Sequence, residues 1–282
     1  MLTKIRGRRE QLINGFLWTA AFSTVIILIL ILSYILLKGI GHISLQFLTD
    51  RPRRMGAEGG IFPVIVGTLY FVALTIMIST PIGVGAAIYL NEYTKEGPLT
   101  RIIRFGTELL AGIPSIIFGL FGYAFFVVLL HDYTQGWSLL SGALTATCMI
   151  LPTMVRTSEE ALKTVPRSYR EGSLSLGANK WQTIYKVVLP TALPGILTGV
   201  ILGIGRAIGE TAALLLTLGG SLLMPKSIFH GARTLSMHLY MVAMETGNME
   251  AAFGTGVVLV FTILFINFMA NFAIKRLVAR NR

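Results

Sequence analysis

The chain has few charged residues. Only 13% of its 282 residues are Asp, Glu, Lys or Arg, whereas 54% are hydrophobic and the mean hydropathy is +0.71. Soluble globular domains carry about 25% charged residues, so this composition excludes that class and indicates an integral membrane protein. Cysteine is almost absent as well. The single Cys148 excludes an intrachain disulfide and is expected to be a small buried hydrophobe.

The sequence also lacks the motifs of several catalytic classes. It contains no Gly-x-x-x-x-Gly-Lys-Ser/Thr loop, with which many proteins hold nucleotide phosphates. No apolar segment carries a cluster of metal-ligand residues, or a nucleophile and a base at workable spacing. We therefore expect no catalytic residue, no bound metal and no cofactor in this chain. If the protein depends on ATP, a partner must hydrolyse it.

The chain does contain apolar runs that are long enough to cross a bilayer. A span needs about 20 apolar residues, and six such runs lie at residues 16–38, 61–90, 107–131, 138–155, 191–219 and 251–274. The first is too long for a secretory signal and no small-residue cleavage site follows it, so it should be retained. The predicted fold class is an all-α membrane protein with six transmembrane helices.

The predicted organisation follows from these runs. Residues 1–60 would hold an N-terminal segment, the first span and an outer loop, and residues 61–275 a core with the other five spans. Residues 276–282 would form a short tail.

Lys and Arg are distributed unevenly between the two sides of this arrangement. Seventeen of the 24 lie before span one, after spans two and four, and at the end of the chain, and six lie in the other loops. Cytoplasmic loops carry the excess of Lys and Arg, so both termini are predicted to be cytoplasmic. The net charge of +11 thus reflects orientation among membrane lipids and not nucleic-acid binding. The RPRR cluster at 51–54 is a local exception.

One inner segment, residues 156–190, is longer than an ordinary connection, which indicates a functional element. Its sequence predicts three short helices: one capped by Ser158, one that begins at Pro166 and ends before Gly177, and one that runs into Pro190. These helices could lie on the bilayer surface, where anionic lipid would hold their basic side chains. Alternatively, they could form a compact projection that contacts another protein.

A motif within this segment resembles the signature loop of ABC importer permeases. The sequence EGSLSLG at 171–177 is followed, after nine residues, by Val187 and then Leu189-Pro190. That family has Glu-Ala-Ala, a later Gly and Ile-x-Leu-Pro, so Gly172, Ser173 and Val187 depart from it by small or apolar changes. In the family this loop forms coupling helices that dock on a cytoplasmic ATPase. The resemblance implies a coupling surface at Arg167, Arg170, Glu171 and Gly177.

The resemblance extends beyond the loop. The segments PIGVGAAIYLNEY, GIPSIIFGLFGYAFF and LPGILTGVILGIGRAIGETAALL, together with the loop, resemble the PstA-type permease family of bacterial phosphate importers over most of residues 61–275. The resemblance implies a MetI-like permease core around a central pathway, in a bacterial plasma membrane. It also implies four kinds of partner: a second, PstC-type permease, a PstB-type ATPase dimer, an external PstS-type phosphate-binding protein and membrane lipid.

Other functions remain open from the sequence. The chain could be a permease for another oxyanion, or the sister subunit of the same phosphate system. It could also be a channel or carrier that works without an ATPase, although a channel has no need of the long inner segment.

The fifth run carries two charges, in GRAIGETAALLL at 205–216. A charge at mid-bilayer costs about 2.5–3.5 kcal/mol and must face protein or water. At 100° per residue, one helix face of about 80° would hold Gly195, Gly199, Gly203, Arg206, Glu210 and Thr217. The three glycines are predicted to pack against another helix, and Arg206, Glu210 and Thr217 to line a substrate pathway. Arg206 and Glu210 could pair to fix helix packing. Alternatively, Arg206 could attract a passing phosphate while Glu210 keeps Arg206 from binding the anion too tightly.

Arg156 and Glu159, at the inner end of the fourth run, are a second charged pair. They could lie at the exit of the pathway. Alternatively, their position could reflect only the preference for positive charge on the inner side.

Overall fold

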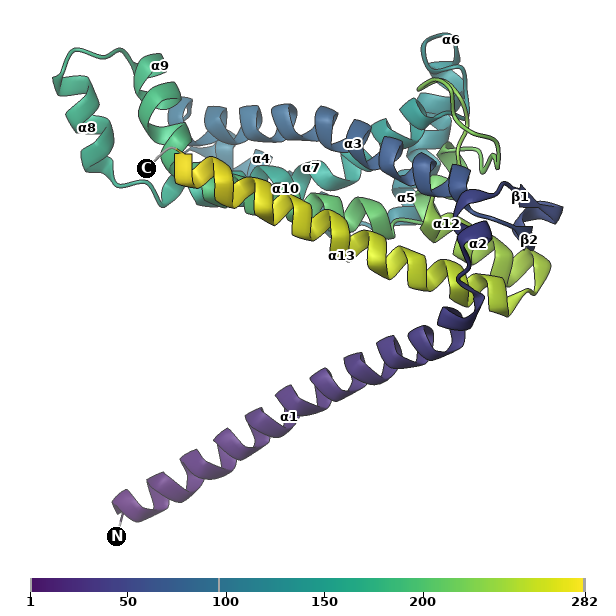
Figure 1. Cartoon of the computed structure of the whole chain (residues 1–282). Coiled ribbons are helices and arrows are strands. Elements are labelled where there is room, and N and C mark those ends of the chain that lie inside the picture. Colours follow the sequence, from purple (N-terminus) through teal and green to yellow (C-terminus); the bar gives the residue numbers. More distant parts are fainter. Residues whose placement is uncertain (1, 96, 281–282) are drawn as a thin grey trace.

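The structure, a computed structural model, describes residues 2–95 and 97–280. Residue 1 of the predicted 1–60 segment and residues 281–282 of the predicted 276–282 tail lie outside the described residues. Within the described part the chain is helical almost throughout (Figure 1). Among the described residues, five helices are long and apolar enough to cross a membrane. They are built around α1 (Leu2–Gly39), α3 (Phe62–Ile88), α7 (Leu139–Lys163), α10 (Leu189–Gly209) and α13 (Met249–Arg280).

The predicted span at 107–131 is wrong at its start. Residues 107–111 belong to α4 (Pro98–Ala111), which is followed by α5 (Ser115–Gly122) and a π-turn, η4 (Tyr123–Leu129). The two helical segments meet at an angle of 102° and give a sixth span only if the bent pair counts as one. Pro114 explains the break, because proline lacks an N–H and disfavours helical backbone in the residue before it.

The core lies where α3, α7 and α10 pack together. Its largest fully buried side chains include Phe71, Met149, Ile150 and Met154. The predicted glycine face of α10 lies directly on α7. A Cβ at Gly195 would lie 2.6 Å from Ala161 Cβ, and one at Gly203 would lie 3.1 Å from Ile150 Cγ2; a Cβ at Gly199 would overlap Thr157. These three glycines therefore allow close contact between the two backbones.

The helix α1 diverges from this bundle (Figure 1). It touches the bundle near its end, where Gly39 lies against the backbone of Phe253 and the ring of Tyr34 lies 5.7 Å from that of Phe253. No residue of its most apolar stretch is buried. Its long apolar surface is suited to contact with lipid or with another membrane protein.

Short elements cover one end of the bundle, which we call the hairpin end. It contains η1 (Ile40–His42), α2 (Leu45–Thr49), strand β1 (Pro52–Arg53), η2 (Arg54–Gly56) and strand β2 (Glu58–Gly59), together with α6 (His131–Thr134), α11 (Ala212–Thr217), α12 (Leu235–Met241) and the π-turn η6 (Val242–Thr246). The two strands are antiparallel, with Pro52 opposite Gly59. The predicted outer loop of residues 39–60 is therefore a small folded unit.

The opposite end, which we call the α8 end, holds α8 (Arg167–Ser175), α9 (Lys180–Thr183) and the π-turn η5 (Ile184–Val188). In Figure 1, α8 and α9 project beyond the bundle, and α1 begins and α13 ends toward the same end. The predicted start of α8 at Pro166 and its stop at Gly177, where φ is +84°, are confirmed.

Two other helix predictions for the segment 156–190 are wrong. Ser158 does not cap a separate helix but is buried within α7, which continues to Lys163. Pro190 does not end a helix, because η5 continues directly into α10 and residues 180–209 form one helical stretch. The projecting part is thus limited to about residues 164–179.

Candidate functional site

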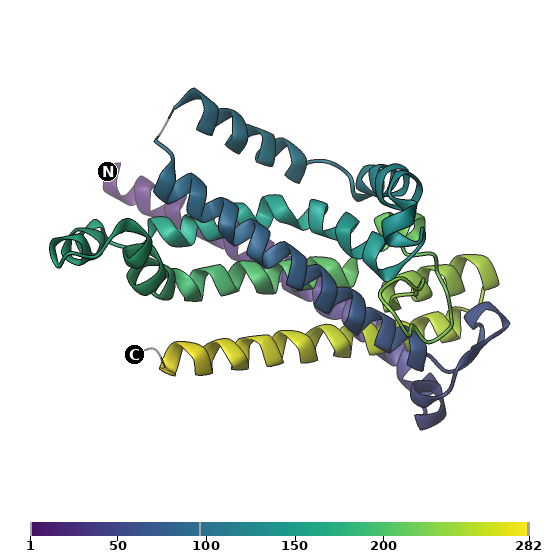
Figure 2. The ribbon, with the colours of Figure 1, turned by 90° about the horizontal axis from the view of Figure 1, so that it is seen from above.

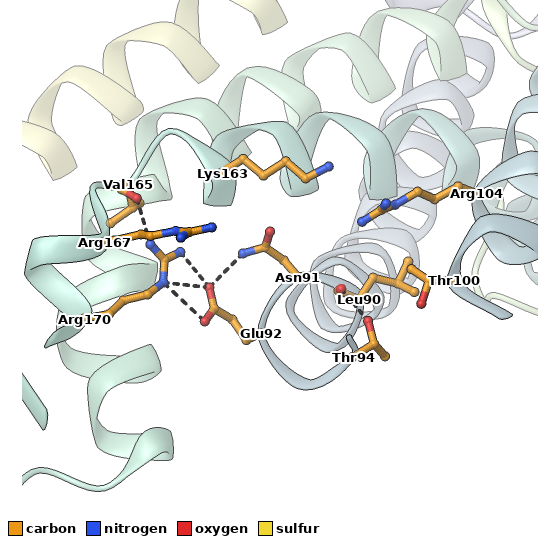
Figure 3. Close-up of a pocket in the computed structure, with 10 residues that line it drawn as sticks. All are labelled: Leu90, Asn91, Glu92, Thr94, Thr100, Arg104, Lys163, Val165, Arg167 and Arg170. Carbon is orange, nitrogen blue, oxygen red and sulfur yellow. Dashed lines mark hydrogen bonds and ion pairs between the residues drawn. The ribbon is translucent and has the colours of Figure 1, made fainter. Parts of the chain in front are cut away.

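An ion pair fixes α8 to the bundle (Figure 3). Glu92 lies in the π-turn η3 (Tyr89–Tyr93) that follows α3. Arg170 Nη2 lies 2.7 Å from Glu92 Oε1, and Arg170 Nε lies 3.3 Å from Oε2. The same guanidinium donates to the carbonyls of Val165, at 2.7 Å, and Leu162, at 3.0 Å. The side chains are 20% and 8% exposed, so one arginine joins α8 to the ends of both α3 and α7.

This geometry separates Arg170 from the other predicted coupling residues. Arg167 and Glu171 are exposed on α8, and Gly177 is exposed just after it. Arg170 instead points back into the chain. It can position the projecting segment but does not present its guanidinium to a partner. Its role was not visible in the sequence because Glu92 is 78 residues away.

Apolar side chains accompany the exposed charges of α8 and α9. Leu174 is 49% exposed, Leu176 is 91% exposed and Trp181 is 62% exposed. A surface with large exposed apolar groups between charges is typical of a site of protein–protein contact. We call this surface, formed by Arg167, Glu171, Leu174, Leu176 and Trp181, the α8 face.

The predicted pair of Arg156 with Glu159 does not form. Glu159 lies 2.6 Å from Arg104 of α4 and 2.7 Å from Lys163, and Arg156 pairs with Glu160 at 3.2 Å. Arg156 and Glu159 are three residues apart, whereas each forms an ion pair with the residue four positions further along α7, Glu160 and Lys163 respectively. Glu159 is only 6% exposed, so it acts as a buried anchor for α4.

A cavity of about 430 Å³ opens beside these ion pairs. Figure 3 shows its lining: Leu90, Asn91, Glu92, Thr94, Thr100, Arg104, Lys163, Val165, Arg167 and Arg170. Four of these residues are cationic and one is a carboxylate. The cavity is therefore suited to an anion.

The predicted helical face of the fifth run is interrupted at its charges. The helix α10 ends at Gly209, Glu210 has extended backbone with ψ of 132°, and α11 begins at Ala212. Glu210 does not pair with Arg206. Its Oε1 accepts from the N–H of Ala213 at 3.0 Å, which satisfies one of the free donors at the start of α11. The prediction that Arg206 and Glu210 meet at i and i+4 is wrong because it assumed one continuous helix.

The break is closed by a residue that the sequence analysis missed. Ser236 Oγ, from α12, donates to the Glu210 carbonyl at 2.6 Å, and both residues are buried. Non-helical backbone at membrane depth is tolerated where protein satisfies its polar groups, as Ser236 does here. Thr217 is also fully buried and donates to the Ala213 carbonyl at 3.0 Å. Its side chain thus faces packed protein in this chain.

Arg206 stands apart from these contacts. It is half-buried in α10, and within residues 2–95 and 97–280 it has no hydrogen-bond or ion-pair partner. Gly203 lies beside Ile150 of the antiparallel α7, so Arg206 lies near the level of residue 148. With a rise of 1.5 Å per residue, that level is about 13 Å from the hairpin end of α7. An arginine with no partner among the described residues therefore lies within the depth of the membrane-crossing bundle.

A second buried arginine lies at the hairpin end. Arg233 is 4% exposed and donates to the carbonyls of Gly220, at 3.0 Å, and Met55, at 3.2 Å, so it holds two outer segments together. Beside it, His238 is fully buried, and burial, followed by the charge of Arg233, lowers its pKa from 6.5 to about 3. One local signal marks this region: Thr234 caps α12 by accepting from Met237 N–H.

Comparison with known proteins identifies the family to which the chain belongs. Residues 79–282 match the family described as the inner membrane component of binding-protein-dependent transport systems. The chain belongs to this family of ABC importer permeases. It is 35% identical over 278 residues to the probable ABC transporter permease protein YqgI of Bacillus subtilis, covering 93% of this chain and 94% of that protein. It is 37% identical over 212 residues to the phosphate transport system permease protein PstA of Pasteurella multocida, covering 75% and 74%.

Solved structures show the same fold. A structure of a bacterial alginate ABC transporter, in complex with an alginate-bound periplasmic protein, superposes with a TM-score of 0.69 at 15% identity and covers 94% of this chain and 96% of that one. The MetNI methionine ABC transporter in an inward-facing conformation gives a TM-score of 0.60 at 21% identity, with 75% and 93% covered. The predicted MetI-like permease fold is thus confirmed. The chain is a multi-pass membrane transport subunit.

Proposed function

We propose that this chain is the PstA-type permease subunit of an ATP-driven importer of inorganic phosphate. The observation that carries the proposal is Arg206, a cation within the bundle that has no partner among the described residues. A guanidinium at this depth is costly unless water, a partner subunit or a substrate compensates its charge. Its planar donor fork matches the oxygen geometry of phosphate. The similarity to curated PstA permeases supports the same substrate.

Arg206 is proposed to line the pathway where this chain meets a second, PstC-type permease. Glu210 would act through the backbone: by capping α11 it keeps the helix break, and hence the end of α10 near Arg206, in one conformation. Arg206 has no ion-pair partner among the described residues that would weaken its attraction for phosphate, yet phosphate must be able to leave. Water in the pathway would weaken this attraction by screening the charge.

The α8 face is proposed to dock on a cytoplasmic, PstB-type ATPase dimer. Its exposed Leu176 and Trp181 would provide apolar contact, and Arg167 and Glu171 would provide orientation. The α8 end and both termini would then be cytoplasmic in a bacterial plasma membrane, as the distribution of Lys and Arg predicts. The hairpin end would face an external, PstS-type phosphate-binding protein.

Substitution of Arg206 tests the pathway. In proteoliposomes that contain the complete importer, Arg206→Ala is expected to lower ATP-dependent phosphate uptake by about tenfold or more, as for a lost charge-assisted hydrogen bond. The matched control is Arg101→Ala, because Arg101 is an exposed arginine on α4 that is not assigned to the pathway. Normal uptake by Arg206→Ala, with the complex assembled, would contradict the pathway role.

The substrate and the motor are tested separately. Phosphate-loaded binding protein should stimulate the ATPase of the complex, and stimulation by another oxyanion alone would identify a different importer. Phosphate uptake by the purified chain without any ATPase would instead indicate a channel or carrier.

Glu171→Lys tests the α8 face. Reversal of this exposed charge is expected to release the ATPase from the purified permease pair. The control is Glu160→Lys, which reverses an exposed carboxylate on α7, outside the α8 face. Retention of the ATPase by Glu171→Lys at the control level would count against docking at this surface.

A further inference from the structure

Three cavities follow one another along the groove between α4 and α7. The first, of about 430 Å³, is the cationic cavity of Figure 3. The second, also of about 430 Å³, shares Leu90, Arg104 and Lys163 with it. The third, of about 570 Å³, shares Thr107, Pro152 and Val155 with the second. Figure 2 shows α4 lying alongside the bundle, with its first residues toward the α8 end. The cavities therefore form one continuous groove that begins at that end.

The end of the groove near α8 is positively charged. Four cations line its first cavity, and two carboxylates, Glu92 and Glu159, pair with three of them. Arg167 is exposed and has no hydrogen-bond or ion-pair partner in the described part of the chain. Lys163 remains half exposed although it pairs with Glu159. This end retains positive charge and free donors for an anionic group.

The other end of the groove is apolar. Its third cavity is lined almost entirely by aliphatic and aromatic side chains, such as Leu110, Ile117 and Phe121, with Thr107 and Cys148 as the exceptions that carry a polar or polarisable group. Water gains little from such a lining, because it offers few hydrogen bonds. An alkyl chain fits it better.

The outward side of α4 is apolar as well. Leu99 is 70% exposed, Ile102 is 67% exposed and Phe105 is 61% exposed. Arg101 of the same helix is exposed, whereas Arg104 turns inward to Glu159, so the outward side of α4 is suited to contact with acyl chains. The groove behind α4 is therefore open to lipid.

We propose that one anionic phospholipid occupies the α4–α7 groove. Its phosphate lies in the cationic cavity near Arg167 and Lys163, and one acyl chain extends past Thr107 into the apolar cavity beside Cys148. One phospholipid molecule supplies both an anionic phosphate and an acyl chain, whereas free phosphate would leave the apolar end empty. The lipid fills the space between α4 and α7 and thereby stabilises the position of α4 beside Glu159.

The headgroup end is tested by lipid retention. The complex, purified in mild detergent and mixed with equal amounts of phosphatidylglycerol and phosphatidylethanolamine of identical acyl chains, is analysed by native mass spectrometry. Phosphatidylglycerol should be retained preferentially. Arg167→Gln should lower this preference about fivefold, the effect of one Lys or Arg near a membrane surface. Lys186→Gln, which removes an exposed cation that lines no cavity described here, should leave it unchanged.

The acyl end is tested by photolabelling. Phosphatidylglycerol with a diazirine at the end of one chain should label peptides that contain residues 110–121 and 148–155. Cys148→Phe, which narrows the cavity, should reduce this labelling, whereas Cys148→Ser should preserve it. Three outcomes would overturn the proposal: equal retention of the two lipids, labelling elsewhere only, or a cross-link from a reagent at Cys148 to a partner subunit. Since Arg167 is exposed, the retention test holds even if Cys148→Phe fails to fold.

Discussion

Removal of the Arg170 guanidinium is expected to loosen the projecting segment from the bundle. In the structure this side chain pairs with Glu92 and donates to two carbonyls at the end of α7, those of Leu162 and Val165. Arg170→Ala leaves the Glu92 carboxylate, which is 8% exposed, without its cation. It also leaves the two carbonyls without this donor.

The expected magnitude follows from this burial. Breaking a buried ion pair by removing one partner costs about 3–5 kcal/mol. Because the Arg170 side chain is 20% exposed and water can reach it, the lower end of that range applies. A cost of about 3 kcal/mol corresponds to a local opening equilibrium more than about a hundredfold larger.

Hydrogen exchange measures this opening directly. Amides of residues 164–179 in the Arg170→Ala complex should exchange about a hundredfold faster, while those in the core of α7 should be unchanged. Transport per ATP hydrolysed should fall too, because the ATPase would move a segment that is no longer attached to α3. Lys186→Ala is the matched control, since Lys186 is exposed in η5 and forms no ion pair among the described residues.

A double variant distinguishes the ion pair from general damage to α8. Glu92→Gln combined with Arg170→Gln leaves no buried charge unpaired, so part of the lost protection should return. If the single variant exchanges at the wild-type rate, Arg170 does not fix the segment and the interpretation of Figure 3 is wrong.

Two further predictions concern packing and pH. Gly199→Ala should lower stability by about 1–3 kcal/mol, because its Cβ would overlap Thr157, whereas Gly205→Ala, with no atom within 4 Å, should not destabilise α10; thermal melting in detergent compares them. For His238, the pKa of about 3 lies below the unfolded value of 6.5, so the unfolded state binds the proton first as pH falls. The free energy of unfolding should therefore fall by about 1.4 kcal/mol per pH unit between pH 6.5 and 3, and melting at pH 7.5 and 5 should show a smaller difference in His238→Phe. An unchanged melting temperature for Gly199→Ala would refute the packing argument. An equal pH difference in His238→Phe and in the wild-type protein would refute the pH argument.

Local signals predicted the elements that depend on local physics. The ends of α8 follow from Pro166, which suits a helix start, and from Gly177, which adopts the positive φ that ends it. Apolar length predicted the helices around residues 16–38, 61–90 and 251–274, because bilayer thickness sets their size. The glycine spacing of α10 predicted a smooth face, and the structure places that face against α7.

The features that sequence reasoning missed depend on residues far apart in the chain. The break after Gly209 is stabilised by Ser236, 26 residues beyond Glu210, and no periodicity within the run reveals that contact. The sequence nevertheless held a local hint: Gly209, Glu210 and Thr211 together resemble a helix end followed by a new helix start. The helical-wheel argument failed for Glu210 and Thr217 because it extended one period across that signal.

The continuity of one helical unit links the two proposed sites. Residues 180–209 form a single helical stretch that begins at the α8 face and ends three residues beyond Arg206. At 1.5 Å per residue it is about 45 Å long. Its glycines lie so close to α7 that the two helices cannot slide without overlap, and Arg170 ties the adjoining α8 to α3. A displacement of the α8 face should therefore reach the level of Arg206 as a movement of α3, α7 and α10 together.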